Sequence, residues 1–457
     1  MSLRQRPARP SSDPATSASS DPPNAPPTSS NHGSAARKRI RLNRVLGRIV
    51  PIILLVYIAY AYDLVVIRYA YRFLHVEQKR TLVPILWLLP THALFVWSLR
   101  AYLRVFFAHD APPTSGAADR AGVLARLRAR LGATFPDPDQ AQQQDEQRIA
   151  QAARALLQAS GRYSDVRIEL CQPDGEPQRC WRDSCNGRLK MLRTRHCGDC
   201  GTCRVGFDHH CAWFDNDVSA AATLRPFVAF LLSIPPLYTL ALAPLFSSAW
   251  RVLVRIHSFA SSDAGISGVW WSQWYSWLGG PAFRWMVGFG LGASRWSRAT
   301  PATMPHESPR APVIVALGAV FTFVASALAT SSLTHLRHAK LTVDVERAKA
   351  IRGLQRRLES AGKSTDSQTS VAAIQQRIDA LAPVQHFRVS WADRESAERR
   401  SRVVSLLIEE GLLSHGGPWT NVRRLLRDSV GTSPGWALSG TALRRVLEKA
   451  ALLTPAQ

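Results

Sequence analysis

Residues 193–213 read RTRHCGDCGTCRVGFDHHCAW. Three cysteines spaced as C-x2-C-x2-C stand here beside three histidines, and Cys211 follows them. All seven cysteines of the 457-residue chain lie between Cys171 and Cys211. A secreted disulfide scaffold is short and spreads its cysteine pairs, whereas tight clustering beside histidines is typical of thiolate metal ligation in a reducing compartment. The stretch therefore predicts a metal-binding domain rather than a disulfide framework.

Eight side chains in this region are candidate metal ligands once Cys211 is set aside. They are Cys180, Cys185, Cys197, Cys200, Cys203, His196, His210 and Asp217, and Cys171 is a reserve candidate. Tetrahedral zinc takes four ligands, so two ions require eight. The sequence predicts two zinc ions with every position filled by protein, which makes both ions structural.

Residues 208–211 can support a different kind of chemistry, acyl transfer by a thiol. Alternate side chains of an extended segment share a face, so His209 and Cys211 can meet while His210 points to the opposite side. His209 is then placed to accept the Cys211 proton, and Asp208 to fix the imidazole tautomer. Strict alternation puts Asp208 on the far face, so we expect a local turn there. The resulting thiolate can attack a thioester and pass the acyl group to a second thiol.

Two long apolar stretches precede the cysteine-rich region and two follow it. They cover residues 49–67, 82–99, 226–250 and 311–334. Each is close to the ~20 residues that cross a bilayer as a helix, so we predict a polytopic α-helical membrane protein with four transmembrane helices. Lys and Arg beside the spans place the N-terminus, the loop after the second span and the C-terminal tail on the cytosolic side.

The uncharged segment 265–283 is rich in tryptophan, with Trp270, Trp271, Trp274 and Trp277. Tryptophan prefers the headgroup level of a membrane. We therefore favour an interfacial helix in the loop on the far side, and a fifth span is the alternative.

The domain organisation follows from these features. We expect a disordered basic N-terminal tail over 1–44, transmembrane helices 1 and 2 within 45–107, a cytosolic helical linker over 108–170 with a helix near 140–159, and the cysteine-rich zinc domain over 171–224. Transmembrane helix 3 (225–254), a lumenal Trp-rich loop (255–310), transmembrane helix 4 (311–336) and a cytosolic C-terminal tail (337–457) follow. In the tail, 343–358 and 395–413 are predicted to be polar helices, with a turn at 416–418.

The net charge points to an anionic partner. Lys and Arg total 57 against 33 Asp and Glu, which gives +24. This disfavours a neutral, self-contained cytosolic enzyme and leaves nucleic acid or an anionic membrane leaflet. The basic residues gather beside the spans, and no basic helix or aromatic platform stands apart from them. We therefore expect the lipid bilayer as the partner and no nucleic acid.

The cysteine-rich region resembles that of the DHHC protein S-acyltransferases, the integral-membrane palmitoyltransferases. Lys190 and Arg193 fall in the family's Lys-Pro-x-Arg motif, the C-x2-C-x2-C spacing is kept, and four residues precede Asp208. Trp213 and Asn216 stand where the family has Trp and Asn. Two spans, this domain and two further spans is also the family's architecture, so the resemblance covers roughly residues 45–350.

The resemblance implies an enzyme that moves a palmitoyl or other long-chain acyl group from acyl-CoA to protein cysteines through an acyl-Cys211 intermediate, with His209 as base and Asp208 as its partner. It implies small β-hairpin zinc knuckles. One zinc would be held by Cys180, Cys185, His196 and Cys203, and the other by Cys197, Cys200, His210 and position 217. The family has a cysteine at that last position, and this chain has Asp217. Four residues separate Cys180 from Cys185, where the family has two.

The position of Cys211, about fifteen residues before the third span, suggests the co-substrate. A fatty acyl-CoA can place its chain among the helices and its carrier in water. Candidate phosphate-binding residues are Lys190, Arg193, Arg195, Arg204 and Arg225, and contact with lipid headgroups explains any one of them equally well. We expect membrane or membrane-associated protein substrates with cytosolic cysteines, and an endomembrane location in the endoplasmic reticulum or Golgi.

Other protein classes share parts of the pattern. A RING-like zinc module requires a second C-x2-C pair well after the histidine and does not account for the spans. A catalytically degenerate DHHC-like scaffold is the stronger alternative, because Asp217, Ser219 and Ala222 depart from the family. Against it, Asp208, His209 and Cys211 are intact.

Two stretches of the tail have two readings each. Residues 342–346 lie where the family has Thr-Thr-x-Glu, although a helix start capped by Thr342 explains the same letters. Residues 417–421 resemble the family's C-terminal aromatic and asparagine contacts, and an ordinary turn is the other interpretation.

Overall fold

The computed structural model describes residues 33–110, 129–158, 162–299, 310–361, 368–381, 384–394, 398–407, 412–426 and 438–453. The chain divides into two compact units, residues 1–42 and 43–457. Helix α1 (Gly33–Tyr62) supplies the described residues of the first unit. The disorder predicted for 1–44 is therefore wrong for 33–44, where alanine, arginine and leucine favour a helix, and residues 1–32 lie outside the described part.

Four helices among the described residues are long and apolar enough to cross a membrane. They cover Ile49–Glu77, Leu82–Phe106, Leu224–Ser262 and Arg310–Arg337. The first joins the end of α1 to the π-helical segment η1 (Asp63–Glu77), and the others are α2, α5 and α8. Side chains such as Leu86 and Phe323 are more than 70% exposed, which suits lipid rather than water. These helices point to an integral membrane protein.

Helix α5 (Leu224–Ser262) is the central span, since both α2 (Leu82–Phe106) and α8 (Arg310–Arg337) pack against it. The Ser233 hydroxyl donates to that of Ser98 at 2.9 Å, which joins α5 to α2. The Tyr238 hydroxyl donates to the carbonyl of Val315 at 3.0 Å, which joins α5 to α8. At ~1.5 Å per residue, the 39 residues of α5 extend to ~58 Å, so this helix is longer than a bilayer core of ~30 Å requires.

The end of α5 packs against α7 (Gly280–Ala299) through Val252, Ile256 and Trp296. Between them, the Trp-rich segment forms α6 (Ala264–Ile266), a π-helical turn (Ser267–Trp271) and a 3-10 turn (Trp274–Trp277). The prediction of one interfacial helix is thus wrong, because Gln273 is extended and interrupts it. No fifth helix among the described residues has the length and apolarity of a span.

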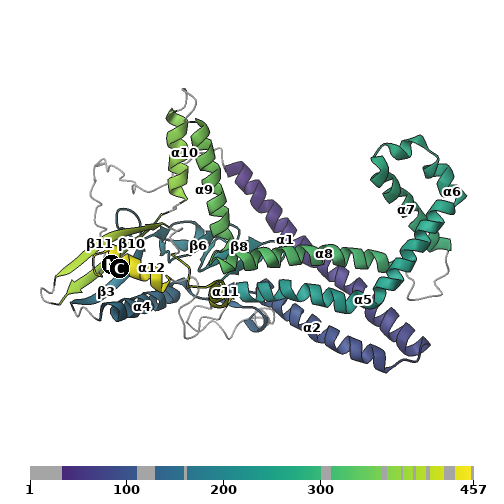
Figure 1. Ribbon diagram of the computed structural model, residues 1–457, viewed down its shortest axis with the longest axis horizontal. Helices are drawn as coiled ribbons and strands as arrows, with labels where there is room; N and C mark the ends of the chain where they lie inside the picture. Colours follow the sequence, from purple (N-terminus) through teal and green to yellow (C-terminus); the bar gives the residue numbers. More distant parts are fainter. Residues whose placement is uncertain are drawn as a thin grey trace, which may run out of the picture. The chain divides into compact units, whose positions relative to one another are not determined.

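A three-stranded antiparallel sheet joins two regions that lie far apart in the sequence (Figure 1). Its order is β11 (Arg399–Leu407), β10 (Val384–Asp393) and β3 (Tyr163–Cys171). Helices α4 (Pro138–Leu157) and α12 (Gly440–Lys449) contribute to the same hydrophobic core, whose buried members include Leu157, Ile168, Val389, Leu406 and Val446. The segment before the cysteine-rich region and the C-terminal tail therefore fold together. We call this part the composite domain.

The sheet corrects the sequence analysis of the tail. The polar helix predicted over 395–413 is wrong, since 399–407 is strand β11. Val404 and Leu406 are buried, whereas Val403 and Leu407 are exposed, which is the two-residue alternation of a strand with one covered face. The helix predicted over 343–358 lies within α9 (Thr342–Ala361), and α4 matches the one predicted near 140–159.

Neighbouring leucines of β11 test this alternation. We expect Leu406→Ala to destabilise the protein by about 2–5 kcal/mol, because a side chain 1% exposed leaves a cavity. Leu407 is 47% exposed, so Leu407→Ala should change stability by less than about 0.5 kcal/mol. Thermal unfolding and limited proteolysis of the full-length protein in detergent would measure both. Equal effects of the two substitutions would contradict the strand.

Candidate functional site

Three short antiparallel pairs of strands build the cysteine-rich region. They are β4 (Arg179–Cys180) with β5 (Arg188–Leu189), β6 (Arg195–Cys197) with β7 (Thr202–Arg204), and β8 (Phe207–Cys211) with β9 (Asn216–Ser219). A two-stranded pair of this size has little core of its own. Bound metal would therefore contribute to holding the pairs together.

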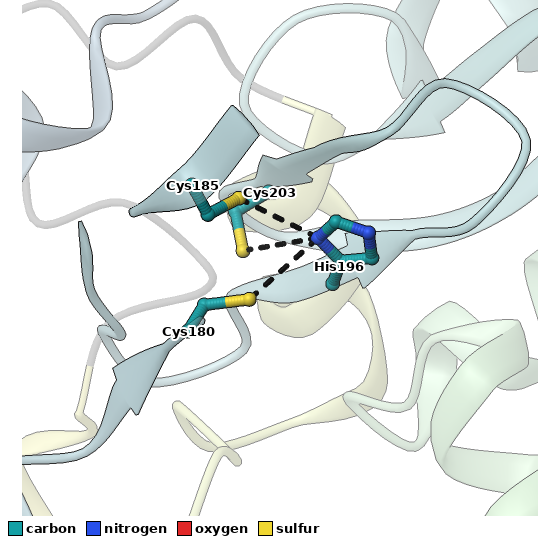
Figure 2. A group of neighbouring side chains, drawn as sticks. All are labelled: Cys180, Cys185, His196 and Cys203. Atoms are coloured by element: carbon teal, nitrogen blue, oxygen red, sulfur yellow. Dashed lines mark hydrogen bonds between the residues drawn. The ribbon is translucent and has the colours of Figure 1, made fainter. Parts of the chain in front are cut away.

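The first group of possible metal ligands comprises Cys180, Cys185, Cys203 and His196 (Figure 2). The distance from His196 Nδ1 is 3.6 Å to Cys180 Sγ, 3.5 Å to Cys185 Sγ and 4.0 Å to Cys203 Sγ. Zinc bonds of ~2.0–2.3 Å in a tetrahedron place ligand atoms ~3.5–3.8 Å apart, so this group fits one zinc ion. The long spacing between Cys180 and Cys185 is taken up by a 3-10 turn (Asp183–Cys185).

An outer partner supports this first group. Asp183 Oδ2 lies 2.8 Å from His196 Nε2, the ring nitrogen that faces away from the sulfurs. A carboxylate in this place fixes the tautomer of a metal-binding histidine. Asp183 was not among the predicted site residues, although its position between Cys180 and Cys185 indicates a residue close to the metal ligands.

The second group comprises Cys197, Cys200, His210 and Asp217. Its distances from His210 Nδ1 are 3.8 Å to Cys197 Sγ, 3.5 Å to Cys200 Sγ and 2.9 Å to Asp217 Oδ1. Two sulfurs, one imidazole and one carboxylate are all acceptable zinc ligands, so this group also fits an ion. Cys171, the reserve candidate, is buried on β3 and belongs to neither group.

Arg204 holds the unusual ligand of the second group. Its Nε donates to Asp217 Oδ2 at 3.0 Å, which leaves Oδ1 toward His210. The same buried guanidinium pairs with Asp110 and lies 4.0 Å from the ring centroid of Phe135. Arg204, predicted as a possible phosphate ligand, instead orients a carboxylate beside the candidate metal site.

Asp208 and His209 are hydrogen-bonded, and Cys211 lies near the same imidazole. His209 Nδ1 is 2.6 Å from Asp208 Oδ2, and Cys211 is close enough to act on the charge of the ring. The ladder between β8 and β9 shifts register between Phe207 and His209, which is the local irregularity expected there. Burial alone would lower the pKa of His209, but the hydrogen bond to Asp208 and the nearby Cys211 outweigh it and raise the pKa to about 10. The surroundings thus stabilise the ring after it has taken a proton.

The start of α9 anchors Asp208. The backbone N–H of Thr342 donates to Asp208 Oδ1 at 2.6 Å, and its hydroxyl donates to Oδ2 at 2.8 Å. Burial would raise the pKa of the Asp208 carboxyl, but hydrogen bonds from His209 and Thr342 hold that pKa below its usual range. Thr342 therefore both begins a helix and contacts the site, so the two interpretations of 342–346 are compatible.

Two asparagines hold other segments against the ends of spans, one from the cysteine-rich region and one from the C-terminal tail. The Asn216 amide donates to the carbonyls of Val105 at 3.0 Å and Ala108 at 2.9 Å, at the end of α2. The Asn421 amide, on α11 (Pro418–Leu426), donates to the Arg337 carbonyl at 3.1 Å, at the end of α8. Residues 417–421 are thus more than an ordinary turn.

The remaining predicted phosphate ligands lie in different surroundings. Arg193 is buried, donates to the Ala339 carbonyl and pairs with Asp344 at 3.1 Å. Lys190 and Arg195 are half-buried, and Arg225 is exposed on the first turn of α5. Arg193 therefore joins the cysteine-rich region to α9.

An apolar cavity of about 380 Å³ lies between the spans. Its lining includes Tyr57, Phe95, Tyr102, Phe230 and Phe321. The Tyr102 hydroxyl donates to the Trp213 carbonyl at 3.1 Å, and the Trp213 ring stacks on Phe321. Because Trp213 follows Cys211 by two residues, the cavity wall contacts the segment that carries the thiol.

Comparison with known proteins finds similarity in this region. Residues 175–278 match the family described as DHHC palmitoyltransferase. Palmitoyltransferase spe-10 of Caenorhabditis elegans is 35% identical over 60 residues, 13% of this chain and 16% of that protein. Probable protein S-acyltransferase 14 of Arabidopsis thaliana is 34% identical over 93 residues, 20% of this chain and 26% of that protein. The chain thus spans about a sixth and a quarter of these relatives, and the resemblance of the cysteine-rich region is confirmed.

Proposed function

We propose, on the premise that residues 175–278 carry a DHHC palmitoyltransferase domain, that the protein is a protein-cysteine S-acyltransferase that uses long-chain acyl-CoA. The observation that carries this proposal is the hydrogen-bonded pair Asp208 and His209, with Cys211 near the same imidazole, beside an apolar cavity. A structural zinc module requires neither these three residues nor the cavity.

Cys211 is the nucleophile in this proposal. His209 takes its proton, and the thiolate forms a bond to the thioester carbonyl carbon while the bond to the CoA sulfur breaks. The CoA thiolate leaves with the proton that His209 held. An acceptor thiol then gives its proton to His209 and forms a bond to the carbonyl carbon of acyl-Cys211. The bond from that carbon to Cys211 Sγ breaks, and the Cys211 thiolate takes the proton back from His209, which restores the free enzyme. Asp208, fixed by Thr342, keeps His209 oriented through both steps.

The acyl chain would occupy the cavity between the spans. Its volume lies in the range of ligand-binding pockets, and its lining is almost wholly apolar. Tyr102 and Phe321 line it and contact Trp213, so a chain bound there would have its thioester end near Cys211. The polar carrier would stay in water.

Two zinc ions would be structural in this proposal. Bound zinc supplies four bonds that fix the strand pairs, and each group fills four positions with protein atoms. Cys211 lies outside both groups and keeps its thiol for acyl transfer.

The active site would face the cytosol of an endomembrane compartment, such as the endoplasmic reticulum or Golgi. Acyl-CoA and reduced cysteines are both cytosolic, and the basic flanks of the spans favour the same side.

An Asn-linked glycosylation acceptor engineered near Ser262 should be modified, and acceptors near Gln142 or Gly440 should not. The reverse pattern would reject this orientation.

Labelling with an alkyne analogue of palmitoyl-CoA tests the proposed activity. The purified protein should acquire a label that hydroxylamine releases, because hydroxylamine cleaves thioesters. Proteins with cysteines near a membrane anchor should accept the acyl group in the same reaction. A folded protein that acquires no hydroxylamine-sensitive label would instead be the degenerate scaffold.

The Thr342 hydroxyl should matter for the rate. Thr342→Val keeps the backbone hydrogen bond to Asp208 and removes the one from the hydroxyl, so we expect self-acylation about tenfold slower. Thr334→Val is the matched control, because among the described residues that hydroxyl bonds the Thr330 carbonyl alone, on the exposed face of α8. Equal rates for the two variants would show that Thr342 does not position Asp208.

A further inference from the structure

The composite domain contains a second cavity, of about 170 Å³, that the proposed acyl transfer does not use. It lies between α4, β3, β10 and the segment that leads into the cysteine-rich region. Apolar side chains form much of its wall: Ile149, Ile168, Leu192, Phe387 and Leu438. A space of this size suits a single side chain rather than a cofactor, because small-molecule sites usually measure ~300 Å³ or more.

A buried carboxylate lines this cavity. Asp145, on α4, is 8% exposed, and no donor in the described part of the chain reaches its Oδ1. Burial raises the pKa of the Asp145 carboxyl to about 6, against the attraction of Arg148 and with the repulsion of Glu146. A buried carboxylate oxygen without a hydrogen-bond donor destabilises a fold, so a donor that reached Oδ1 would be stabilising.

Two other acids of the cavity already have partners. Glu169 pairs with Arg388 at 2.5 Å, and Glu146 accepts a hydrogen bond from Gln142 at 2.8 Å. Lys190 also lines the cavity, and Arg148 attracts the Asp145 carboxylate. Neither donates to Asp145 Oδ1, which has no hydrogen-bond donor among the described residues.

We propose that this cavity binds the side chain of a lysine or arginine from a partner polypeptide. The methylene groups would pack on Ile149, Ile168 and Phe387, while the ammonium or guanidinium group would donate to Asp145. A basic side chain can contact both the apolar wall and the Asp145 carboxylate, whereas an apolar side chain leaves Asp145 Oδ1 without a hydrogen-bond donor. The site is independent of the proposed acyl transfer, because neither metal group nor the segment 208–211 takes part.

Saturation-transfer difference NMR on the full-length protein in nanodiscs would test the site. The probes are the peptide Gly-Ser-Gly-Lys-Gly-Ser-Gly and the same peptide with norleucine in place of lysine. We expect the lysine peptide to bind at least about tenfold more tightly, since one charge-assisted hydrogen bond separates the two. Asp145→Asn should remove that difference. Asp139→Asn is the matched control on the exposed part of α4 and should preserve it.

Two further measurements distinguish loss of peptide binding from misfolding and from loss of the proposed acyl transfer. Asp145→Asn should unfold at the same or a higher temperature at pH 8, because the wild-type carboxyl, with its raised pKa, is ionised there and unpaired. Its self-acylation should equal that of the wild type. Equal binding of the two peptides would overturn the proposal. Binding of n-butylamine as tightly as the lysine peptide would also overturn it, because the cavity would then be a site for free amines.

Discussion

Cys211→Ala should abolish self-acylation and transfer, with both falling at least about a thousandfold. The variant lacks the sulfur that forms the thioester, and no described cysteine outside the two metal groups can replace it, since Cys171 is fully buried. His209→Ala should lower both rates by about 100- to 10,000-fold, because it removes the proton acceptor and leaves the thiol. Hydroxylamine-sensitive labelling with the alkyne acyl-CoA would measure self-acylation, and label on a cysteine-containing acceptor would measure transfer.

Cys171→Ala provides the matched control for this experiment. It also removes one cysteine, yet Cys171 lies on β3 of the composite domain and in neither metal group. Labelling should therefore persist in this variant. Wild-type labelling of Cys211→Ala would reject Cys211 as nucleophile, and wild-type rates for His209→Ala would assign proton transfer to another group.

Local spacing explains what the sequence could predict of the site. Metal ligands on short strand pairs lie close in both sequence and space, so Cys197, Cys200 and His210 could be identified as candidate ligands from their spacing. Their assignment to one group came from the family resemblance. The partners of these groups are harder to find. Thr342 reaches Asp208 from 134 positions away, and Asp110 reaches Arg204 from 94. No pattern within either segment shows such a contact, and it depends on how the spans pack.

The fold divides in the same way. Membrane helices are encoded by long apolar runs, which are visible without any partner. Strand β11 was predicted as a helix because its sequence is basic and polar on one side, and its buried face needs β10 to exist. Strand β3 was missed for the same reason, because it pairs with β10 more than two hundred residues later. The composite domain thus depends on long-range pairing that a single sequence does not show.

Asp217→Ala should lower the zinc content from two ions per chain to one. The second group would keep three ligands and lose the fourth, while the first group shares no residue with it. Arg204 would also lose the carboxylate that accepts a hydrogen bond from its Nε. Of the two acids that pair with this buried cation, Asp110 would remain. Inductively coupled plasma mass spectrometry on the full-length protein, purified without chelators, would count the ions.

Asp217→Cys separates the loss of a ligand from the loss of charge. Cysteine restores a thiolate at this position, so the variant should retain two ions and release the second more slowly to a chelator than the wild type does. Arg204→Met keeps all four ligands but removes the support of Asp217, so one ion should be lost about 10- to 100-fold more readily while the other is unaffected. Retention of two tightly held ions by Asp217→Ala would remove Asp217 from the ligands. Loss of both ions in that variant would instead show that the strand pairs fold as one unit, with the second group stabilising the first.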